Sequence, residues 1–163
     1  MERVPTLVQS TDPHFVTRCP AQPEHVWQQN HSGVFYSSDG AATWKRVSRP
    51  EQGVHFGFPV CVAPSVGTTA WLVPGKADME RTTIGGALFV ARTEDGGQTW
   101  KQLREGLPQQ VAYDVVYRHA FGNTDDCLAF GSTTGNLYVS EDRGDTWQTV
   151  ANNLPPIYSV RFA

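Results

Sequence analysis

The chain has 163 residues, of which 39% are hydrophobic and 18% charged, and its formal net charge is -3. This length suits one domain with a hydrophobic core. The slightly acidic balance and the scatter of 13 basic residues exclude a broad attraction to phosphate backbones, so we expect no nucleic-acid partner. The 15 glycines and 11 prolines predict many turns, and therefore short strands rather than long helices.

Export, membrane insertion and disulfide bonding are not predicted. Residues Met1–Ser10 lack the basic start and the apolar run of a secretory signal, and no stretch approaches the ~20 apolar residues of a membrane-spanning helix. We therefore expect a cytoplasmic protein with no membrane partner. The cysteines Cys19, Cys61 and Cys127 are separated by 42 and 66 residues, which favours buried free thiols over a disulfide framework or a zinc site.

The strand pattern repeats three times along the chain, in units covering residues 15–50, 58–105 and 113–150. Each unit contains four short runs with apolar content, bounded by turn residues. In the first unit the predicted strands are Phe15–Cys19, His25–Gln28, Gly33–Tyr36 and Lys45–Val47. In the second they are Pro59–Val62, Ala70–Val73, Leu88–Ala91 and Lys101–Leu103. In the third they are Tyr113–Tyr117, Cys127–Phe130, Asn136–Val139 and Gln148–Val150.

An eight-residue segment, here called the box, links the third and fourth predicted strands of each unit. The three boxes are Ser37–Trp44, Thr93–Trp100 and Ser140–Trp147, and they share the pattern Ser/Thr-x-Asp-x-Gly/Ala-x-Thr-Trp. Their tryptophans recur at intervals of 56 and 47 residues, within the range that is typical of propeller blades.

The box residues have a structural explanation as a hairpin turn. The aspartate accepts hydrogen bonds from backbone N–H groups of its own turn, and glycine adopts a positive φ at low steric cost. The threonine suits the restart of a strand, and the tryptophan buries a large ring against a neighbouring hairpin. In the first box Ala41 replaces the glycine. The residues expected to be structural are Asp39, Thr43, Trp44, Asp95, Gly97, Thr99, Trp100, Asp142, Gly144, Thr146 and Trp147.

Together the units predict an all-β fold, a β-propeller arc of three four-stranded antiparallel blades within a single partial propeller over residues 1–163. One extra strand is expected at residues 157–163, around Ser159–Phe162, as the first strand of an incomplete further blade. An arc leaves two apolar blade faces uncovered. The expected partner is therefore a missing propeller half or further copies of the chain that close a ring.

The boxes resemble the Asp-box, or BNR, repeat of sialidases, sortilin-type receptors, some xyloglucan hydrolases and photosystem assembly factors. The chain is similar, over roughly residues 15–163, to the C-terminal half of bacterial repeat proteins labelled sialidase-like. Segments outside the boxes add to the likeness, namely Val26–His31, Phe56–Pro59 and Leu154–Pro156. The resemblance implies that Asp39, Asp95 and Asp142 lie on the side of the propeller away from the catalytic pocket and are not catalytic.

A sialidase-like site, as the resemblance implies it, requires an arginine triad, a tyrosine nucleophile with a glutamate, and an aspartate acid/base. The early Phe/Tyr-Arg-Ile-Pro motif of the family is absent from this sequence. The sequence therefore favours a noncatalytic module that binds protein or carbohydrate. The alternative is a sialidase-like glycoside hydrolase whose remaining catalytic residues lie in missing blades or in a partner subunit. A third interpretation, an assembly factor for a larger complex, rests on fold analogy alone.

Ligand contacts are expected on the loops that face away from the boxes. The candidates are His31, His55, Arg81, Tyr113 and Asp114. Each has a plain structural alternative: a hydrogen-bonded turn for the histidines, a solvated pair with Glu80 for Arg81, and strand alternation for Tyr113 and Asp114. We expect no cofactor and no metal, because the adjacent acids Asp125 and Asp126 lack further oxygen ligands at regular spacing.

Overall fold

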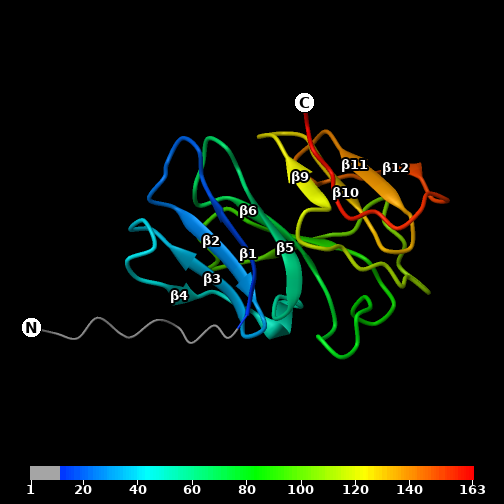
Figure 1. Cartoon of the computed structure of the whole chain (residues 1–163), viewed down its shortest axis with the longest axis horizontal. Helices are drawn as coiled ribbons and strands as arrows, with labels where there is room; N and C mark the ends of the chain where they lie inside the picture. Colours follow the sequence, from blue (N-terminus) through cyan, green and yellow to red (C-terminus); the bar gives the residue numbers. More distant parts are fainter. Residues whose placement is uncertain (1–11) are drawn as a thin grey trace, which may run out of the picture.

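A computed structural model describes residues 12–163, and these residues form twelve strands in three four-stranded antiparallel sheets (Figure 1). The predicted all-β architecture of three repeated units is therefore confirmed. The expectation about an export signal in Met1–Ser10 concerns residues outside the described part of the chain. Between residues 12 and 163, no helix has the length and hydropathy needed to cross a membrane.

Each sheet is a meander in which consecutive strands pair. The first sheet contains β1 (Pro13–Arg18), β2 (Val26–Asn30), β3 (Gly33–Ser37) and β4 (Lys45–Arg46). The second, after the short 3-10 helix η1 (Pro50–Gln52), contains β5 (Gly57–Val62), β6 (Ala70–Pro74), β7 (Val90–Thr93) and β8 (Lys101–Leu103). The third contains β9 (Phe121–Asn123), β10 (Leu128–Gly131), β11 (Leu137–Ser140) and β12 (Gln148–Ala151).

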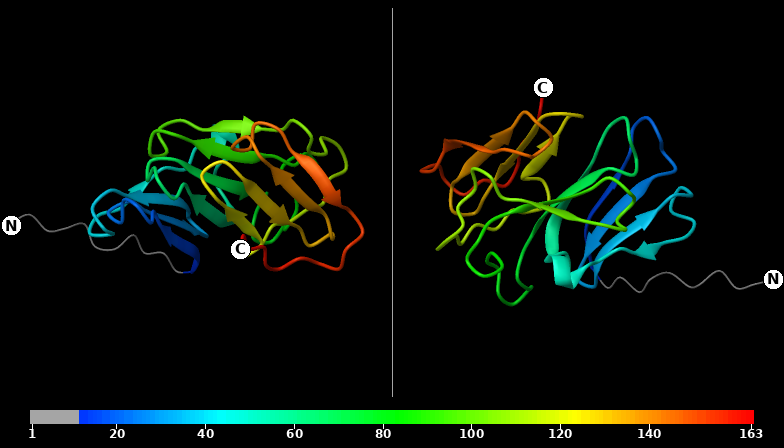
Figure 2. Two further views of the ribbon diagram at one scale, coloured as in Figure 1. Left: turned by 90° about the horizontal axis from the view of Figure 1, so that it is seen from above. Right: turned by 180° about the vertical axis from the view of Figure 1, so that it is seen from behind.

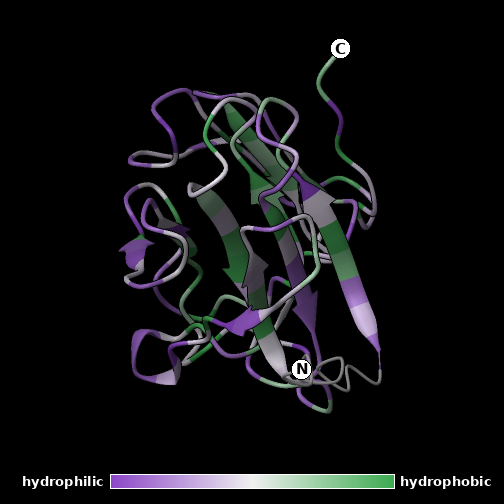
Figure 3. Ribbon diagram, turned by 90° about the vertical axis from the view of Figure 1, so that its left-hand side faces the viewer, coloured by the Kyte–Doolittle hydropathy of each residue, from purple (hydrophilic) through white to green (hydrophobic). Residues whose placement is uncertain are grey.

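The three sheets follow one another in chain order, like blades, and β1 and β9 each lie beside β5 (Figure 2). The second sheet is buried on both faces because its side chains alternate between two neighbours. The cross-strand row Val60, Leu72 and Ala91 packs in the cluster shared with the first sheet. The adjacent residues Cys61 and Trp71 pack in the cluster shared with the third sheet. Hydrophobic colouring accordingly concentrates on the central strands (Figure 3).

The boxes form the turns between the third and fourth strands, and they share one hydrogen-bonding pattern. In the second box the Asp95 carboxylate accepts the backbone N–H of Thr99 at 3.0 Å and the Thr99 hydroxyl at 2.6 Å. The Thr93 hydroxyl donates to the same carboxylate and accepts the N–H of Gly97 at 2.9 Å. The corresponding bonds recur in the first box and in the third. A carboxylate that is saturated by its own turn acts as a folding device.

The box tryptophans pack toward the preceding sheet. Trp100 is buried in the cluster between the first and second sheets and donates its indole N–H to Val47 O at 3.1 Å. Trp147 is buried between the second and third sheets against Phe130. Trp44 belongs to the first sheet, which has no preceding sheet within residues 12–163, and this side chain is only partly buried. The same motif therefore has different packing in the first unit.

The sequence predicts the first strand of the third unit at Tyr113–Tyr117, and this prediction is wrong. The strand lies at Phe121–Asn123, and residues 113–117 form no ladder. The apolar run is explained by packing without pairing, since Val115 contacts the Phe56 cluster and Val116 packs in the core. The predicted extra strand near residue 159 is a single parallel bridge, between His119 and Ser159.

Candidate functional site

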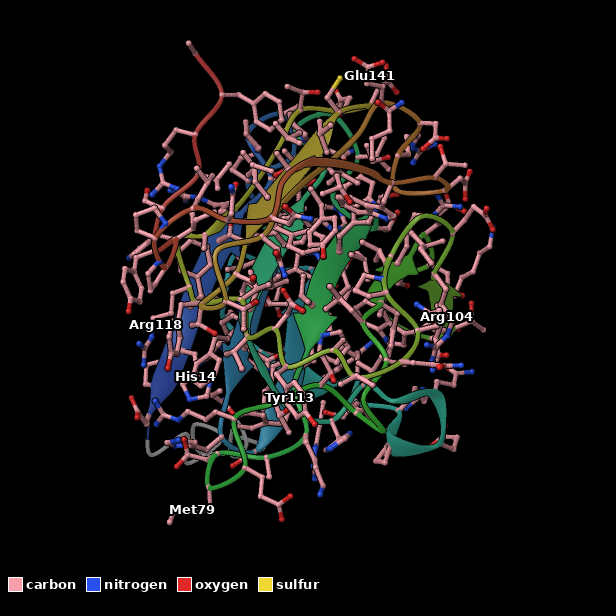
Figure 4. The ribbon with its side chains drawn as sticks, turned by 90° about the vertical axis from the view of Figure 1, so that its right-hand side faces the viewer. His14, Met79, Arg104, Tyr113, Arg118 and Glu141 are labelled. Atoms are coloured by element: carbon pink, nitrogen blue, oxygen red, sulfur yellow. The ribbon has the colours of Figure 1, made fainter. Side chains whose placement is uncertain are left out.

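The loops opposite the boxes form an open surface pocket of about 580 Å³. Figure 4 shows Glu141 of the third box at one end of the molecule and Met79, in the β6–β7 loop, at the other. The pocket is built by the β2–β3 turn, by β4, by the segment between η1 and β5, and by the β6–β7 loop. Its lining residues are His31, Ser32, Arg46, His55, Phe56, Lys76, Ala77 and Asp78.

Basic groups dominate the pocket lining. Arg46 is exposed and has no ion pair within the described residues, whereas Lys76 is paired with Glu80. His55 donates its Nε2–H to Lys76 O at 2.9 Å, which fixes the ring on the pocket wall. Among the described lining residues, one side chain, that of Asp78, is acidic. This arrangement suits recognition of an acidic group better than proton transfer between two carboxylates.

His31 belongs to a chain of polar contacts along the pocket edge. Its Nε2 lies 3.5 Å from Asp78 Oδ1, and its Nδ1 lies 3.7 Å from Asp12 Oδ2. Arg81 donates to Asp78 at 3.0 Å and to the hydroxyl of Tyr117 at 3.4 Å. Partial desolvation acts the other way, but the hydrogen bond and charge of Arg81 hold the pKa of Asp78 below its ordinary value.

A buried histidine that sequence reasoning missed lies beside His31. His14, on β1, is only 4% exposed and its ring lies edge-on to His31 at a centroid distance of 4.5 Å. Its Nδ1–H donates to Gly57 O at 2.6 Å, and its buried Nε2 has no partner within the described residues. Burial lowers the pKa of His14, so the neutral imidazole is favoured. The available signal was positional: His14 and His31 lie at the same end of the paired strands β1 and β2.

The structure brings together some of the predicted ligand-face residues and separates others. His31 and His55 line the same pocket, and Arg81 reaches it through Asp78. Tyr113 is 64% exposed and does not line this pocket. Asp114 is buried, and its Oδ1 accepts hydrogen bonds from Ser132, Thr134 and Asn136, so its carboxylate holds the β10–β11 turn.

Three side chains with metal-ligating groups lie close together at this edge of the pocket, whereas the sequence analysis expected no metal. Asp12, His14 and His31 each offer one ligand atom, and these atoms lie within 4.8 Å of one another. The residues come from the start of β1 and from the turn after β2, so the pairing of these two strands brings them together.

Solved structures similar to this chain are β-propeller proteins. An ancestral GH74 enzyme matches with a TM-score of 0.64 and 19% identity, over 88% of this chain and 19% of that chain. YCF48 from Cyanidioschyzon merolae matches with a TM-score of 0.59 and 18% identity, over 94% and 44%. The GH74 xyloglucanase from Xanthomonas campestris matches with a TM-score of 0.57 and 18% identity, over 81% and 20%.

These likenesses establish the class of fold: the chain consists of β-propeller blades. At identities of 18 to 19% they carry the fold alone. The chain spans about a fifth of the GH74 enzymes and less than half of YCF48. No protein-family model matches the sequence. No curated protein matches it either.

Proposed function

We propose that the chain is a noncatalytic binding module of the Asp-box propeller type, which takes a protein or carbohydrate ligand on the loops opposite the boxes. The observation that carries the proposal is the contrast between the two ends of the sheets. The box carboxylates are saturated by their own turns, whereas the pocket presents the exposed guanidinium of Arg46 beside His55 and Phe56. An exposed arginine that has no ion pair among the described residues, on a rigid sheet beside the pocket loops, is suited to ligand contact.

The pocket chemistry favours a ligand with a carboxylate or another acidic group. Arg46 offers a planar fork of donors, and His31 and His55 add rings to the same pocket. Both an acidic peptide and an acidic sugar carry such a group. A neutral oligosaccharide would offer Arg46 hydroxyl acceptors but no opposite charge, and hydrogen bonds to a carboxylate are the stronger kind.

The alternative, a sialidase-like glycoside hydrolase completed by other blades or a partner subunit, has less support. A sialidase-like site needs an arginine triad and a tyrosine nucleophile with a glutamate, whereas the described pocket lining contains one arginine and neither a tyrosine nor a glutamate. Within residues 12–163 the pocket lining supplies Asp78, and this carboxylate is held by Arg81 and His31. Turnover of fluorogenic sialosides or xyloglucan oligosaccharides by the purified chain would overturn the noncatalytic assignment.

We also propose that the module works within a larger ring, completed by further blades or by copies of the chain. The motivating observation is exposed apolar surface on the outer sheets: Val16 in β1 is 51% exposed and Val150 in β12 is 58% exposed. Ala129 and Val139 form a cross-strand pair on β10 and β11 that is only partly buried. A compact monomer in sedimentation at micromolar concentration would contradict assembly from copies of the chain.

The binding proposal is tested with two matched arginine variants. The purified chain is applied to an array of acidic and neutral glycans and to a library of acidic peptides, and affinities for the hits are measured by calorimetry. Arg46→Ala should weaken binding at least about tenfold. Arg18→Ala is the control, because Arg18 is also an exposed arginine of the first sheet but lies at the opposite end of β1. Equal affinities of the two variants for the ligand would contradict binding in this pocket.

A further inference from the structure

The starting observation is a buried nitrogen without a partner. His14 is only 4% exposed, yet its Nε2 makes no hydrogen bond to any described residue. A buried acceptor without a hydrogen-bond partner lowers the stability of the folded state, so its presence calls for an explanation. The Nδ1–H bond to Gly57 O fixes the tautomer in which the Nε2 lone pair is free. This is the form in which histidine binds a metal ion, with the other ring nitrogen held by a carbonyl.

The neighbours of this nitrogen are ligand-type side chains. His31 packs edge-on to His14, and Asp12 approaches the Nδ1 of His31. The ligand atoms of Asp12, His14 and His31 lie within 4.8 Å of one another. Ligands bound at about 2.0–2.2 Å lie about 3–4 Å apart. Asp12 and His31 are both exposed, so their side chains have room to rotate toward His14.

A second layer of contacts orients the ligand-type residues. The Nε2 of His31 faces Asp78, so its Nδ1 is left toward Asp12, and Asp78 is itself held by Arg81. Such carboxylate–histidine pairs accompany most metal-binding imidazoles and set ring orientation. Phe56 and Phe58 pack around His14 at centroid distances of 5.6 and 4.6 Å and form an apolar wall.

We propose that Asp12, His14 and His31 form a binding site for a divalent transition-metal ion of the zinc type, with Asp78 and Gly57 O as outer partners. Two imidazoles and one carboxylate suit Zn²⁺ and its neighbours in the first transition row, and they suit Mg²⁺ and Ca²⁺ poorly because those ions prefer oxygen ligands. Three protein ligands leave at least one coordination position free. His31 and Asp78 also line the pocket, so the free position would lie at the pocket edge.

This inference does not depend on the proposed binding function, because metal uptake is measured without any other ligand. The probe is Zn²⁺ added to the metal-free chain, from which any affinity tag has been removed, and Co²⁺ serves as a spectroscopic reporter. The background carries Cys127→Ser, since Cys127 is a partly exposed free thiol. We expect one equivalent of Zn²⁺ by calorimetry, a rise in melting temperature, and visible Co²⁺ absorption bands shaped by nitrogen ligands.

Four variants separate a built site from surface binding. His31→Ala and Asp12→Asn, both at exposed positions, should lower Zn²⁺ affinity at least about 100-fold, and Asp78→Asn should lower it about 10- to 100-fold. His119→Ala is the control, because it removes an exposed histidine that lies outside this pocket and is not a proposed ligand, and it should leave the affinity unchanged. These positions avoid the buried His14, whose replacement endangers folding.

Three results would overturn the site. The first is the absence of stoichiometric Zn²⁺ binding by the folded chain. The second is an affinity that His31→Ala and Asp12→Asn leave unchanged. The third is equal loss of affinity in His119→Ala and His31→Ala, which would indicate diffuse histidine binding.

Discussion

At the box end of the sheets, three carboxylates accept the same set of hydrogen bonds, whereas at the opposite end each loop has its own length and composition. At the box end the aspartate carboxylates are satisfied within eight residues of chain. The pocket end satisfies polar groups across the fold, as in the contact of His14 on β1 with Gly57 O on β5. The comparison teaches that hydrogen bonds within single turns stabilise the box end. Polar side chains that no such turn satisfies lie at the pocket end, and these are the ones available for ligands.

The largest expected effect concerns the tryptophans of the box end. Trp100→Ala should lower the free energy of unfolding by about 3–5 kcal/mol, because it removes a fully packed indole between two sheets. Trp44→Ala should cost less than half as much, since Trp44 is only partly buried. Urea unfolding followed by circular dichroism measures both. Equal losses would indicate that another surface covers Trp44 in solution.

The next effect separates a box carboxylate from a pocket carboxylate. Asp95→Ala should lower the free energy of unfolding by about 2 kcal/mol, because three donors in one turn lose their acceptor. Asp78→Ala should lower it much less, because its ion pairs are solvent-exposed and such pairs contribute little to stability. The same urea titration decides the matter. A larger loss for Asp78→Ala than for Asp95→Ala would contradict the division between the two ends.

A smaller effect is a pH dependence that originates at the box end. The hydrogen bonds from Thr43 and Ser37 lower the pKa of Asp39 from its ordinary 3.8 to about 2. Desolvation opposes the shift in Asp95 and Asp142, but the bonds from Thr99 and Thr146 still hold the pKa of each carboxyl below its ordinary value. A depressed folded pKa gives stability that is fully present above the ordinary value and is lost as the pH falls toward the folded value.

Unfolding free energies measured from pH 5 to pH 2 test this dependence. The wild type should lose stability as the pH falls below about 4, and Asp39→Asn should show a shallower loss over the same range because it no longer titrates at that turn. An equally steep loss in Asp39→Asn would place the acid sensitivity elsewhere.

The box end was predictable from the sequence because its cause is local. The spacing of Asp95, Thr99 and Trp100 encodes the turn, and the structure has that turn in all three units. The strand at Tyr113–Tyr117 was mispredicted because a run of β-branched and aromatic residues indicates that side chains are buried, and does not show that the backbone pairs with another strand. Val115 and Val116 of that run are buried by Phe56 and by the core, while Phe121 takes the place on the ladder.

The pocket end was predictable only in part. The loops that form it follow from the blade topology, and the structure places the predicted residues His31 and His55 on one pocket. His14 was missed because its position is that of an ordinary strand residue, and the Gly57 O to which it donates belongs to the backbone of a distant strand. Asp114 was predicted on the ligand face, whereas in the structure its carboxylate is bonded by Ser132, Thr134 and Asn136. The sequence does not reveal that these three side chains converge on it.

The smallest predicted effect tests the strain within the box end itself. The fifth box position has φ of 84° at Gly97 and 91° at Gly144, and Ala41 adopts the same left-handed region at 74°. A residue with a Cβ in this region is strained by about 1–2 kcal/mol, and glycine relieves this strain. Glycine also raises the conformational entropy of the unfolded chain, which offsets part of the stabilisation. Ala41→Gly should therefore stabilise the protein by about 0.5–1 kcal/mol, measured as a raised urea midpoint at unchanged slope. Gly97→Ala is the counterpart and should destabilise, because its Cβ would also lie 2.5 Å from the Cβ of the buried Val47. If Ala41→Gly had no effect, Ala41 would not be strained, and the hydrogen bonds from Ser37 and Thr43 would fix the first turn by themselves. The three boxes would then be energetically alike despite their different residues.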